Sequence, residues 1–310
     1  MFCPKKHFEF KDIPDLTGKT AIITGANTGI GRVCALEMAK KGCKVIFACR
    51  TESKTLPVIE EIKKETGNTQ LEFVALDLMS LQSVKKFVET IKSRNEKLNI
   101  LLNNAGVMMC PFGLSADGIE TQFATNHVAH FYLTTQLLPL LEENTPSRIV
   151  TVSSLGHRGA IGSLDLENIS DPKKYSRHFH YCKSKAANVL FTRELAKRLK
   201  EKGVENVFVN CNHPGVVRSD LTRHLLGTTL TKIYNATFTI TTEDGALAQL
   251  YLATSPEVEE KNVKGQYYVP YGDVGTVSAL ASSDKNALEL WDFTENLLKE
   301  KVDGYKGSPI

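Results

Sequence analysis

The chain has 310 residues, which is enough for one large α/β domain or two small ones. Hydrophobic residues make up 42% of it and charged residues 24%, the composition of an ordinary soluble globular protein. The net charge of +3 is small and no basic run accompanies it, which excludes nucleic acid as an expected partner.

Short β-branched segments alternate with longer amphipathic ones over the first two-thirds of the chain. The predicted strands are Thr20–Thr24, Lys44–Cys49, Leu71–Leu76, Asn99–Asn103, Arg148–Ser153 and Asn206–Asn210. The predicted helices are Gly29–Lys41, Lys54–Thr66, Leu81–Arg94, Gly118–Glu142 and Tyr175–Lys200. This alternation is typical of βαβ crossovers, and the nearly continuous apolar strands favour a parallel sheet covered on both faces.

The last third of the chain adds a helix at Thr242–Thr254, a strand at Gln266–Val269 and a helix near Asn286–Lys299. No Pro/Gly/Ser-rich linker interrupts the pattern. We therefore expect a single doubly wound, Rossmann-type α/β domain over residues 18–303, with an N-terminal extension at 1–17 and a loose C-terminal tail at 304–310. Ligands bind such sheets at the carboxyl ends of the strands, where the strand order reverses.

The first strand leads directly into the sequence TGANTGIGR. Gly25, Gly29 and Gly31 lie between a strand and a helix, the context that a dinucleotide site requires. Glycines permit a tight turn and a close approach of the backbone to a pyrophosphate, while the helix N-terminus supplies amide donors and a favourable dipole. A plain tight turn fits the same residues.

Two arginines bear on the choice of cofactor: Arg32 directly after the glycine turn, and Arg50 at the end of the second strand. An acidic residue there usually binds the ribose hydroxyls of NAD, whereas an arginine suits the 2′-phosphate of NADP. Arg50 and Arg32 therefore favour NADP(H), and Glu52 keeps NAD open. Alternatively, Arg50 is a solvent-exposed charge in a loop with no role in cofactor binding.

Tyr181 and Lys185 are four residues apart, so on a helix they share one face. A tyrosine with its ordinary pKa of about 10 is a poor acid–base group at neutral pH, and a nearby positive charge favours the phenolate. Hydride transfer with the redox cofactor that the glycine turn predicts would need an acid–base group of this kind. Two surface residues on an amphipathic helix would have the same spacing.

With these motifs, the chain resembles the short-chain dehydrogenase/reductase family over nearly its whole length. The residues that carry the resemblance are TGANTGIG, Asp77–Leu78, Asn103–Gly106, Asn126, Ser153–Ser154, Tyr181, Lys185 and Pro214–Gly215. The three residues between the first two glycines match the branch that performs oxidoreduction, and not the branch of sugar-nucleotide epimerases and dehydratases.

The resemblance implies four catalytic residues. Tyr181 would be the general acid–base, Lys185 would lower its pKa and bind the nicotinamide ribose, and Ser154 would hydrogen-bond the substrate oxygen. Asn126 would hold a helix irregularity and a water of the proton relay. Ser153 competes with Ser154, and the family pattern favours the second serine.

The resemblance also implies a cofactor-binding set. Asp77 resembles the adenine-contacting residue, Asn104 the structural asparagine of the turn that lines the groove, and Pro214–Gly215 the turn beside the nicotinamide. By themselves, Asp77 and Asn104 also fit loop caps. The full set is Gly25, Asn27, Thr28, Gly29, Ile30, Gly31, Arg32, Arg50, Asp77, Leu78, Asn104, Ala105, Gly106, Tyr181, Lys185, Pro214, Gly215, Val217 and Ser219.

Four segments resemble the retinol-dehydrogenase-like and WW-domain-oxidoreductase-like members, namely the long stretch Ser154–Tyr181, Ala48–Arg50, Phe123–His127 and His213–Gly215. That group mostly handles apolar alcohols, aldehydes and ketones. The resemblance thus implies an NADP(H)-dependent oxidoreductase of a small lipophilic carbonyl or alcohol, with a retinoid- or steroid-like compound among the candidates. A cofactor-binding regulatory or scaffold protein without turnover is the alternative.

Three further expectations concern the surface of the protein. We expect a substrate flap from Val217 to about Ile240. Its apolar side chains are equally consistent with contact to a lipophilic substrate, packing on the core or an oligomer contact. Within it, Ser219 replaces the threonine of the family's PGxxxT pattern and keeps the hydroxyl. His157 lies in a polar loop and is expected at the surface, and a homodimer stays open.

The cysteines and the N-terminus indicate the compartment. The seven cysteines are scattered without a CxxC pair, which favours reduced, buried thiols and no bound metal. There is no signal-peptide core and no apolar run of the ~20 residues that a membrane span needs. We expect a cytoplasmic protein, with peripheral association with endoplasmic reticulum or lipid droplets left open.

Overall fold

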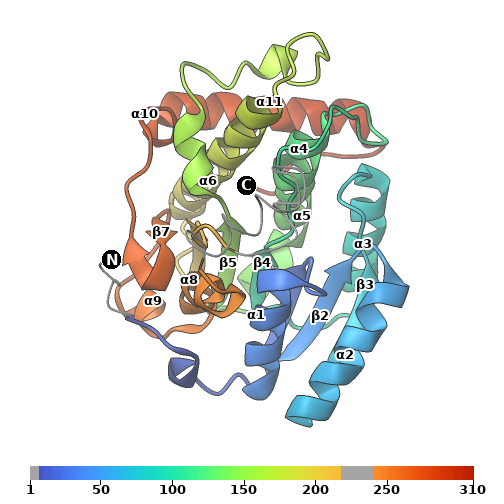
Figure 1. The fold of residues 1–310 in the computed structure, drawn as a ribbon, viewed down its shortest axis with the longest axis vertical. Coiled ribbons are helices and arrows are strands. Elements are labelled where there is room, and N and C mark those ends of the chain that lie inside the picture. Colours follow the sequence, from blue (N-terminus) through green and yellow to red (C-terminus); the bar gives the residue numbers. More distant parts are fainter. Residues whose placement is uncertain (1–6, 218–239) are drawn as a thin grey trace, which may run out of the picture.

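The structure, a computed structural model, describes residues 7–217 and 240–310. Its centre is a sheet of eight strands in the order β3-β2-β1-β4-β5-β6-β7-β8 (Figure 1). The first seven are parallel, and the two-residue edge strand β8 runs antiparallel to β7. The strands are β1 Thr20–Thr24, β2 Lys44–Cys49, β3 Leu71–Ala75, β4 Ile100–Asn103, β5 Ser147–Val152, β6 Val207–Asn212, β7 Tyr267–Val269 and β8 Asp273–Val274.

Helices cover both faces of this sheet, as Figure 1 shows. The α-helices are α1 Gly29–Lys40, α2 Glu52–Thr66, α3 Leu81–Ser93, α4 Thr121–Phe123, α5 Ala129–Glu143, α6 Arg177–Glu201, α8 Thr242–Thr254, α9 Glu257–Glu260, α10 Ala279–Ser282 and α11 Asp284–Lys301. Alternate strand residues divide between the two faces: Ile22 and Leu101 pack with α3, α5, α6 and α11, whereas Ile23 and Leu102 pack with α1, α2 and α8. The expected doubly wound fold is confirmed.

The strand order reverses between β1 and β4, which are neighbours in the sheet although β2 and β3 intervene in the chain. The loops that follow β1, β4, β5 and β6 therefore meet at one edge of the sheet. Such a crevice is where doubly wound sheets bind their ligands.

The predicted helix Gly118–Glu142 is wrong as a continuous element. The chain turns at Gly118, whose φ is +77°. The helix α4 begins only after Glu120, whose carboxylate accepts hydrogen bonds from the backbone amides of Gln122 and Phe123. A π-helical turn at Ala124–Val128 then separates α4 from α5. Single π-turns of this kind are frequent at functional sites.

The described residues near both ends of the chain pack against the domain. In the N-terminal extension, Phe8 is buried and its ring lies edge-on to Tyr251, 5.6 Å between centroids. The prediction of a loose tail at 304–310 is wrong, because the Tyr305 hydroxyl and the Ser308 amide both donate to Glu295, each at 3.0 Å. Of the six described cysteines, all with free thiols, five are buried.

Candidate functional site

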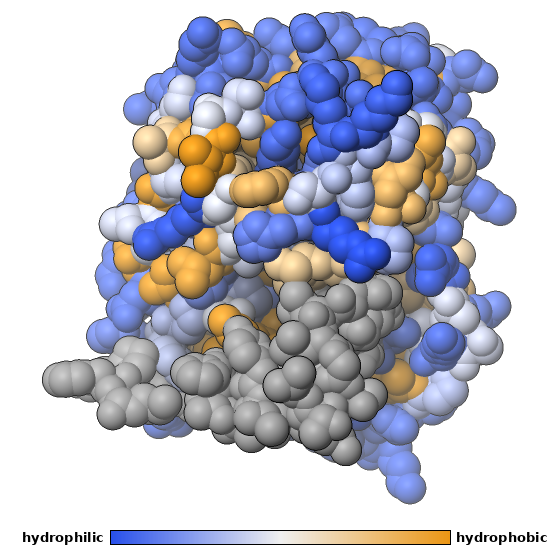
Figure 2. Space-filling view, turned by 45° about the horizontal axis from the view of Figure 1, so that its top comes forward, coloured by the Kyte–Doolittle hydropathy of each residue, from blue (hydrophilic) through white to orange (hydrophobic). Residues whose placement is uncertain are grey.

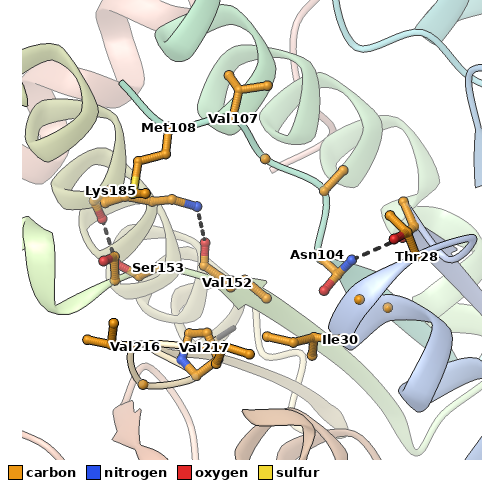
Figure 3. Close-up of a pocket in the computed structure, with 18 of the residues that line it drawn as sticks. Thr28, Ile30, Asn104, Val107, Met108, Val152, Ser153, Lys185, Val216 and Val217 are labelled. Carbon is orange, nitrogen blue, oxygen red and sulfur yellow. Dashed lines mark hydrogen bonds between the residues drawn. The ribbon is translucent and has the colours of Figure 1, made fainter. Parts of the chain in front are cut away.

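A cavity of about 340 Å³ lies at the switch-point edge of the sheet (Figure 3). It runs from the glycine turn after β1, past the loop after β4, to the loops after β5 and β6. Fourteen of the predicted site residues line it: Gly25, Thr28, Gly29, Ile30, Gly31, Asn104, Ala105, Gly106, Ser154, Tyr181, Lys185, Pro214, Gly215 and Val217. Segments far apart in the sequence therefore converge on one site.

The glycine turn is as tight as the sequence predicts. Gly25 and Gly29 have φ values of +67° and +56°, which glycine adopts readily. A Cβ on Gly31 would lie 2.5 Å from both the Gly25 carbonyl oxygen and the Asn104 amide nitrogen. Backbone thus packs where a side chain would otherwise be, and the N-terminus of α1 is left facing the cavity. This cradle fits a pyrophosphate.

Asn104 connects the loop after β4 to the glycine turn. Its side chain donates to the Thr24 carbonyl at 2.8 Å, and its backbone amide donates to the Thr24 hydroxyl at 2.9 Å, as does that of Ala105. His130, which we did not predict, completes this network through a 2.9 Å contact between its Nε2 and the same hydroxyl. Its Nδ1 lies 3.2 Å from the Asn126 carbonyl in the π-turn.

Asn126 does not line the cavity but supports its wall. The side chain is fully buried, accepts a hydrogen bond from the Val107 amide, and donates to the Val107 carbonyl and the Ser184 hydroxyl, at 2.8 to 2.9 Å. Val107 and Met108, which we had not predicted, form the cavity wall that this clamp holds. Their position directly after the Asn103–Gly106 motif was the signal for them.

Lys185 is buried in the cavity with 3% of its surface exposed and donates to the Val152 carbonyl at 2.9 Å (Figure 3). Burial lowers its pKa from the ordinary 10.5 to about 8. Its ammonium lies 5.9 Å from the centre of the Tyr181 ring. The two residues share one helix, α6, and one cavity, so they are not a surface pair.

Burial raises the pKa of Tyr181 to about 12, while a hydrogen bond with Ser154 acts in the lowering direction. We expected Lys185 to lower this pKa, but burial is the larger effect. Tyr181 is therefore a protonated phenol at neutral pH, the form that donates a proton. Its removal from water is the physical reason.

Ser154 and Ser153 play different parts. The Ser154 oxygen accepts from the Gly156 amide at 3.0 Å, which leaves its own hydrogen for another acceptor. Ser153 instead donates to the Lys185 carbonyl at 2.7 Å, a buried contact within the frame of the site. The second serine is thus the one available for a substrate, as the family pattern favours.

Six predicted residues lie outside the cavity lining. Asp77 accepts a hydrogen bond from the Met79 amide at 3.0 Å, a loop cap, and Arg32 pairs with Glu61 at 3.1 Å. Arg50 is exposed directly after β2, beside the strand that carries the glycine turn. The others are Asn27, Leu78 and Asn126. Ser219 and the interior of the predicted flap lie outside the described residues. The two ends of the flap, Val217 and Ile240, pair in a parallel bridge.

The surface placement that we expected for His157 is wrong. Its side chain is completely buried, because the segment before α10 covers it and the ring of Tyr267 lies against it. His213 is also buried, and its ring is stacked on the ring of Tyr267, with 5.9 Å between centroids. Within the described part of the chain, neither imidazole has a hydrogen bond to a serine hydroxyl, so neither forms a hydrolase-like pair there.

A family model described as short chain dehydrogenase matches residues 19–164. Human retinol dehydrogenase 12 is 43% identical over 91% of this chain and 87% of that protein, and human retinol dehydrogenase 13 is 41% identical over 99% and 91%. The chain belongs to the short-chain dehydrogenase/reductase family. It is accordingly an oxidoreductase of alcohol and carbonyl groups, similar to the retinol dehydrogenases.

Solved structures agree with this assignment. An uncharacterised protein from Mycobacterium paratuberculosis has a TM-score of 0.76 and 32% identity over 94% of this chain and 97% of that one. A short-chain dehydrogenase from Escherichia coli CFT073, solved with NADPH, has a TM-score of 0.64 and 25% identity over 82% and 98%. Within residues 7–217 and 240–310, no helix is long and apolar enough to cross a membrane.

Proposed function

We propose that this protein is an NADP(H)-dependent oxidoreductase that interconverts a lipophilic alcohol and its carbonyl compound, with Tyr181 as the general acid–base. The observation that carries the proposal is the convergence of Ser154, Tyr181 and Lys185 at one end of a cavity whose other end is the glycine turn. A redox site needs both ends, one for the cofactor and one for proton transfer.

The residues present fit a nicotinamide dinucleotide. The N-terminus of α1 and the turn Gly25–Gly31 would hold the pyrophosphate, and Lys185 has two N–H groups beyond the one given to Val152 for the nicotinamide ribose. When bound, the cofactor supplies or accepts a hydride. The NADPH in the Escherichia coli structure supports the choice of NADP(H) over NAD.

In the direction of reduction, the protein's own residues handle the oxygen of the substrate. Ser154 would donate its hydroxyl hydrogen to the carbonyl oxygen, and Tyr181 would give up its proton to the same oxygen as negative charge develops there. The raised pKa of Tyr181 suits this role, because it keeps the phenol protonated at neutral pH. Lys185 would stabilise the phenolate that remains.

Apolar surroundings support a lipophilic substrate. Met108 and Val216 line the cavity, and exposed apolar side chains follow the carboxyl ends of β4, β5 and β6, among them Phe112, Leu155 and Ile161. On the face shown in Figure 2, apolar patches are small and separated by hydrophilic surface. These side chains would therefore serve a small molecule better than a large partner.

Turnover of NADPH with a panel of aliphatic, aromatic, isoprenoid and steroid carbonyls tests the proposal. Tyr181→Phe should fold and bind NADPH but lose nearly all turnover. The control Tyr305→Phe removes the hydroxyl of a tail tyrosine that donates to Glu295 on α11, and it should keep its turnover. Full activity in Tyr181→Phe would refute the assignment. Tight NADPH binding without turnover across the panel would favour the regulatory role.

Arg50 provides a separate test of the cofactor. Because the side chain is exposed beside the glycine turn, Arg50→Asp should weaken NADPH binding by at least tenfold and NADH binding far less. Fluorescence titration with both cofactors measures the difference. Equal losses would mean that the 2′-phosphate is read elsewhere. The homodimer and the cytoplasmic location stay predictions, which sedimentation and cell fractionation can check.

A further inference from the structure

His157 is buried directly behind the serine of the site. It lies in the 3₁₀ turn Leu155–Gly159 that follows β5 and Ser154, and its Nδ1 is 2.7 Å from the Ser154 carbonyl oxygen. On the other side of the ring, Nε2 accepts a hydrogen bond from the Ser278 amide at 3.2 Å. One imidazole thus joins the site to a segment 121 residues further along the chain.

These two contacts fix the state of the ring. A backbone amide can only donate, so Nε2 must be the acceptor and the ring hydrogen must be on Nδ1. Nδ1 then donates to the Ser154 carbonyl. Burial lowers the pKa of His157 below its ordinary 6.5, which agrees with a neutral ring. The Ser278 amide therefore selects the tautomer that holds Ser154.

The ring itself has no freedom to turn away from these partners. It is completely buried and meets Tyr267 edge-on, with 4.8 Å between centroids at 65°. Arg158, the next residue, donates to the carbonyl and the hydroxyl of Thr276, so the same turn is tied twice to the segment before α10. The Arg158 contacts are exposed, whereas the contact between the His157 ring and the Ser278 amide is partly buried.

We infer that His157 is a positioning residue, which holds the Ser154 backbone, and with it the serine hydroxyl, in the orientation for catalysis, under the control of the Ser278 amide. The inference rests on the proposed role of Ser154. His157 does not line the cavity. It acts by preorganisation, where a displacement of about 1 Å at the reacting groups can cost roughly 100-fold in rate.

Two substitutions at His157 separate the contacts. The carboxamide of His157→Asn has an N–H at the place of Nδ1 and can still hold Ser154. The longer His157→Gln reaches toward Ser278 and leaves the Ser154 carbonyl with only the backbone amide of residue 157, which donates to it at 3.1 Å. We expect kcat within about threefold of the parent for His157→Asn and roughly 10- to 100-fold lower for His157→Gln. NADPH affinity should change less than about twofold in both.

Ser278 offers a matched pair that leaves the imidazole in place. Its φ of −68° suits proline, so Ser278→Pro removes the amide hydrogen without backbone strain at φ, and Ser278→Ala is the control because both lose the side-chain cap on Ala281. Only Ser278→Pro should lower kcat, by about tenfold. Added to His157→Asn it should have no further effect, because a carboxamide needs no tautomer to be selected.

The comparison with Tyr181→Phe keeps the two proposals apart. An inactive Tyr181→Phe beside a fully active His157→Gln would overturn the positioning role alone, while an active Tyr181→Phe would refute the function itself. A His157→Gln protein that loses thermal stability but keeps its kcat per folded molecule would likewise overturn the inference. Should His157→Gln fail to fold, the Ser278 pair decides.

Discussion

Lys185 is predicted to cost the protein stability, and its replacement by methionine tests this. A pKa lowered from 10.5 to about 8 corresponds to a cost of about 3 kcal/mol for carrying the buried charge at neutral pH. Methionine has nearly the same shape and no charge. The hydrogen bond lost with it is worth about 1 kcal/mol, and the Val152 carbonyl still accepts from Asn188 at 3.1 Å.

We therefore expect Lys185→Met to be more stable than the parent by about 1–2 kcal/mol at pH 7, and to be inactive. At roughly 2 °C per kcal/mol, its Tm should rise by about 2–4 °C. Thermal unfolding at a series of pH values gives the measurement, with NADPH turnover recorded beside it.

The pH dependence has a definite sign. Because the folded state binds the Lys185 proton less tightly than the unfolded state, the cost is full below pH 8 and is relieved as the pH rises from about 8 toward 10.5. The advantage of Lys185→Met should fade over that range. A variant that is less stable at pH 7, or whose advantage does not change with pH, would refute the reasoning.

Two other substitutions test the frame of the site. Asn126→Ala removes three hydrogen bonds of a buried side chain and should lower the free energy of unfolding by about 2–4 kcal/mol in denaturant unfolding. NADPH binding should also weaken, because the cavity wall at Val107 loosens. Unchanged stability would mean that these hydrogen bonds are dispensable. Gly31→Ala places a methyl 2.5 Å from the Gly25 carbonyl oxygen and should cost about 1–3 kcal/mol and most NADPH affinity, whereas Gly67→Ala, in open space, should cost only backbone strain and no affinity. NADPH binding to Gly31→Ala at the parent's affinity would contradict the proposed cradle.

Local patterns were sufficient for most of the fold. The strands Thr20–Thr24 and Lys44–Cys49 and the helix Thr242–Thr254 have the bounds that the sequence predicts, because β-branched runs and a helical period depend on near neighbours. The glycine turn was equally readable, since its spacing and its place after a strand are local. The features that the sequence predicted well are those determined by interactions between residues close together in the chain.

Tertiary contacts decided the rest. The helix pattern continues unbroken through Ala124–Val128, and the bonds from Asn126 to Val107 and Ser184 that accompany the π-turn are tertiary contacts. His157 reads as a polar loop residue because the segment that buries it follows more than a hundred residues later. The tail reads as loose because Glu295, its acceptor, is on α11.

The Thr24 hydroxyl shows how such contacts make one site out of separate motifs. It accepts the amides of Asn104 and Ala105, so its single hydrogen is left for His130 Nε2. His130 must then have its own hydrogen on Nδ1, which faces the Asn126 carbonyl at 3.2 Å; burial lowers the pKa of His130 to about 4 and keeps the ring neutral.

The glycine turn, the loop after β4 and the π-turn are therefore connected through one hydroxyl and one imidazole. A buried network of this kind is favourable only when every member is paired, and the loss of one member leaves the others unsatisfied. Such a network tolerates few substitutions, but it makes the site rigid at the place where a cofactor and a substrate must meet within tenths of an ångström. His157 and Ser278 repeat the same arrangement on the substrate side, where a buried imidazole again joins two segments that are far apart in the chain.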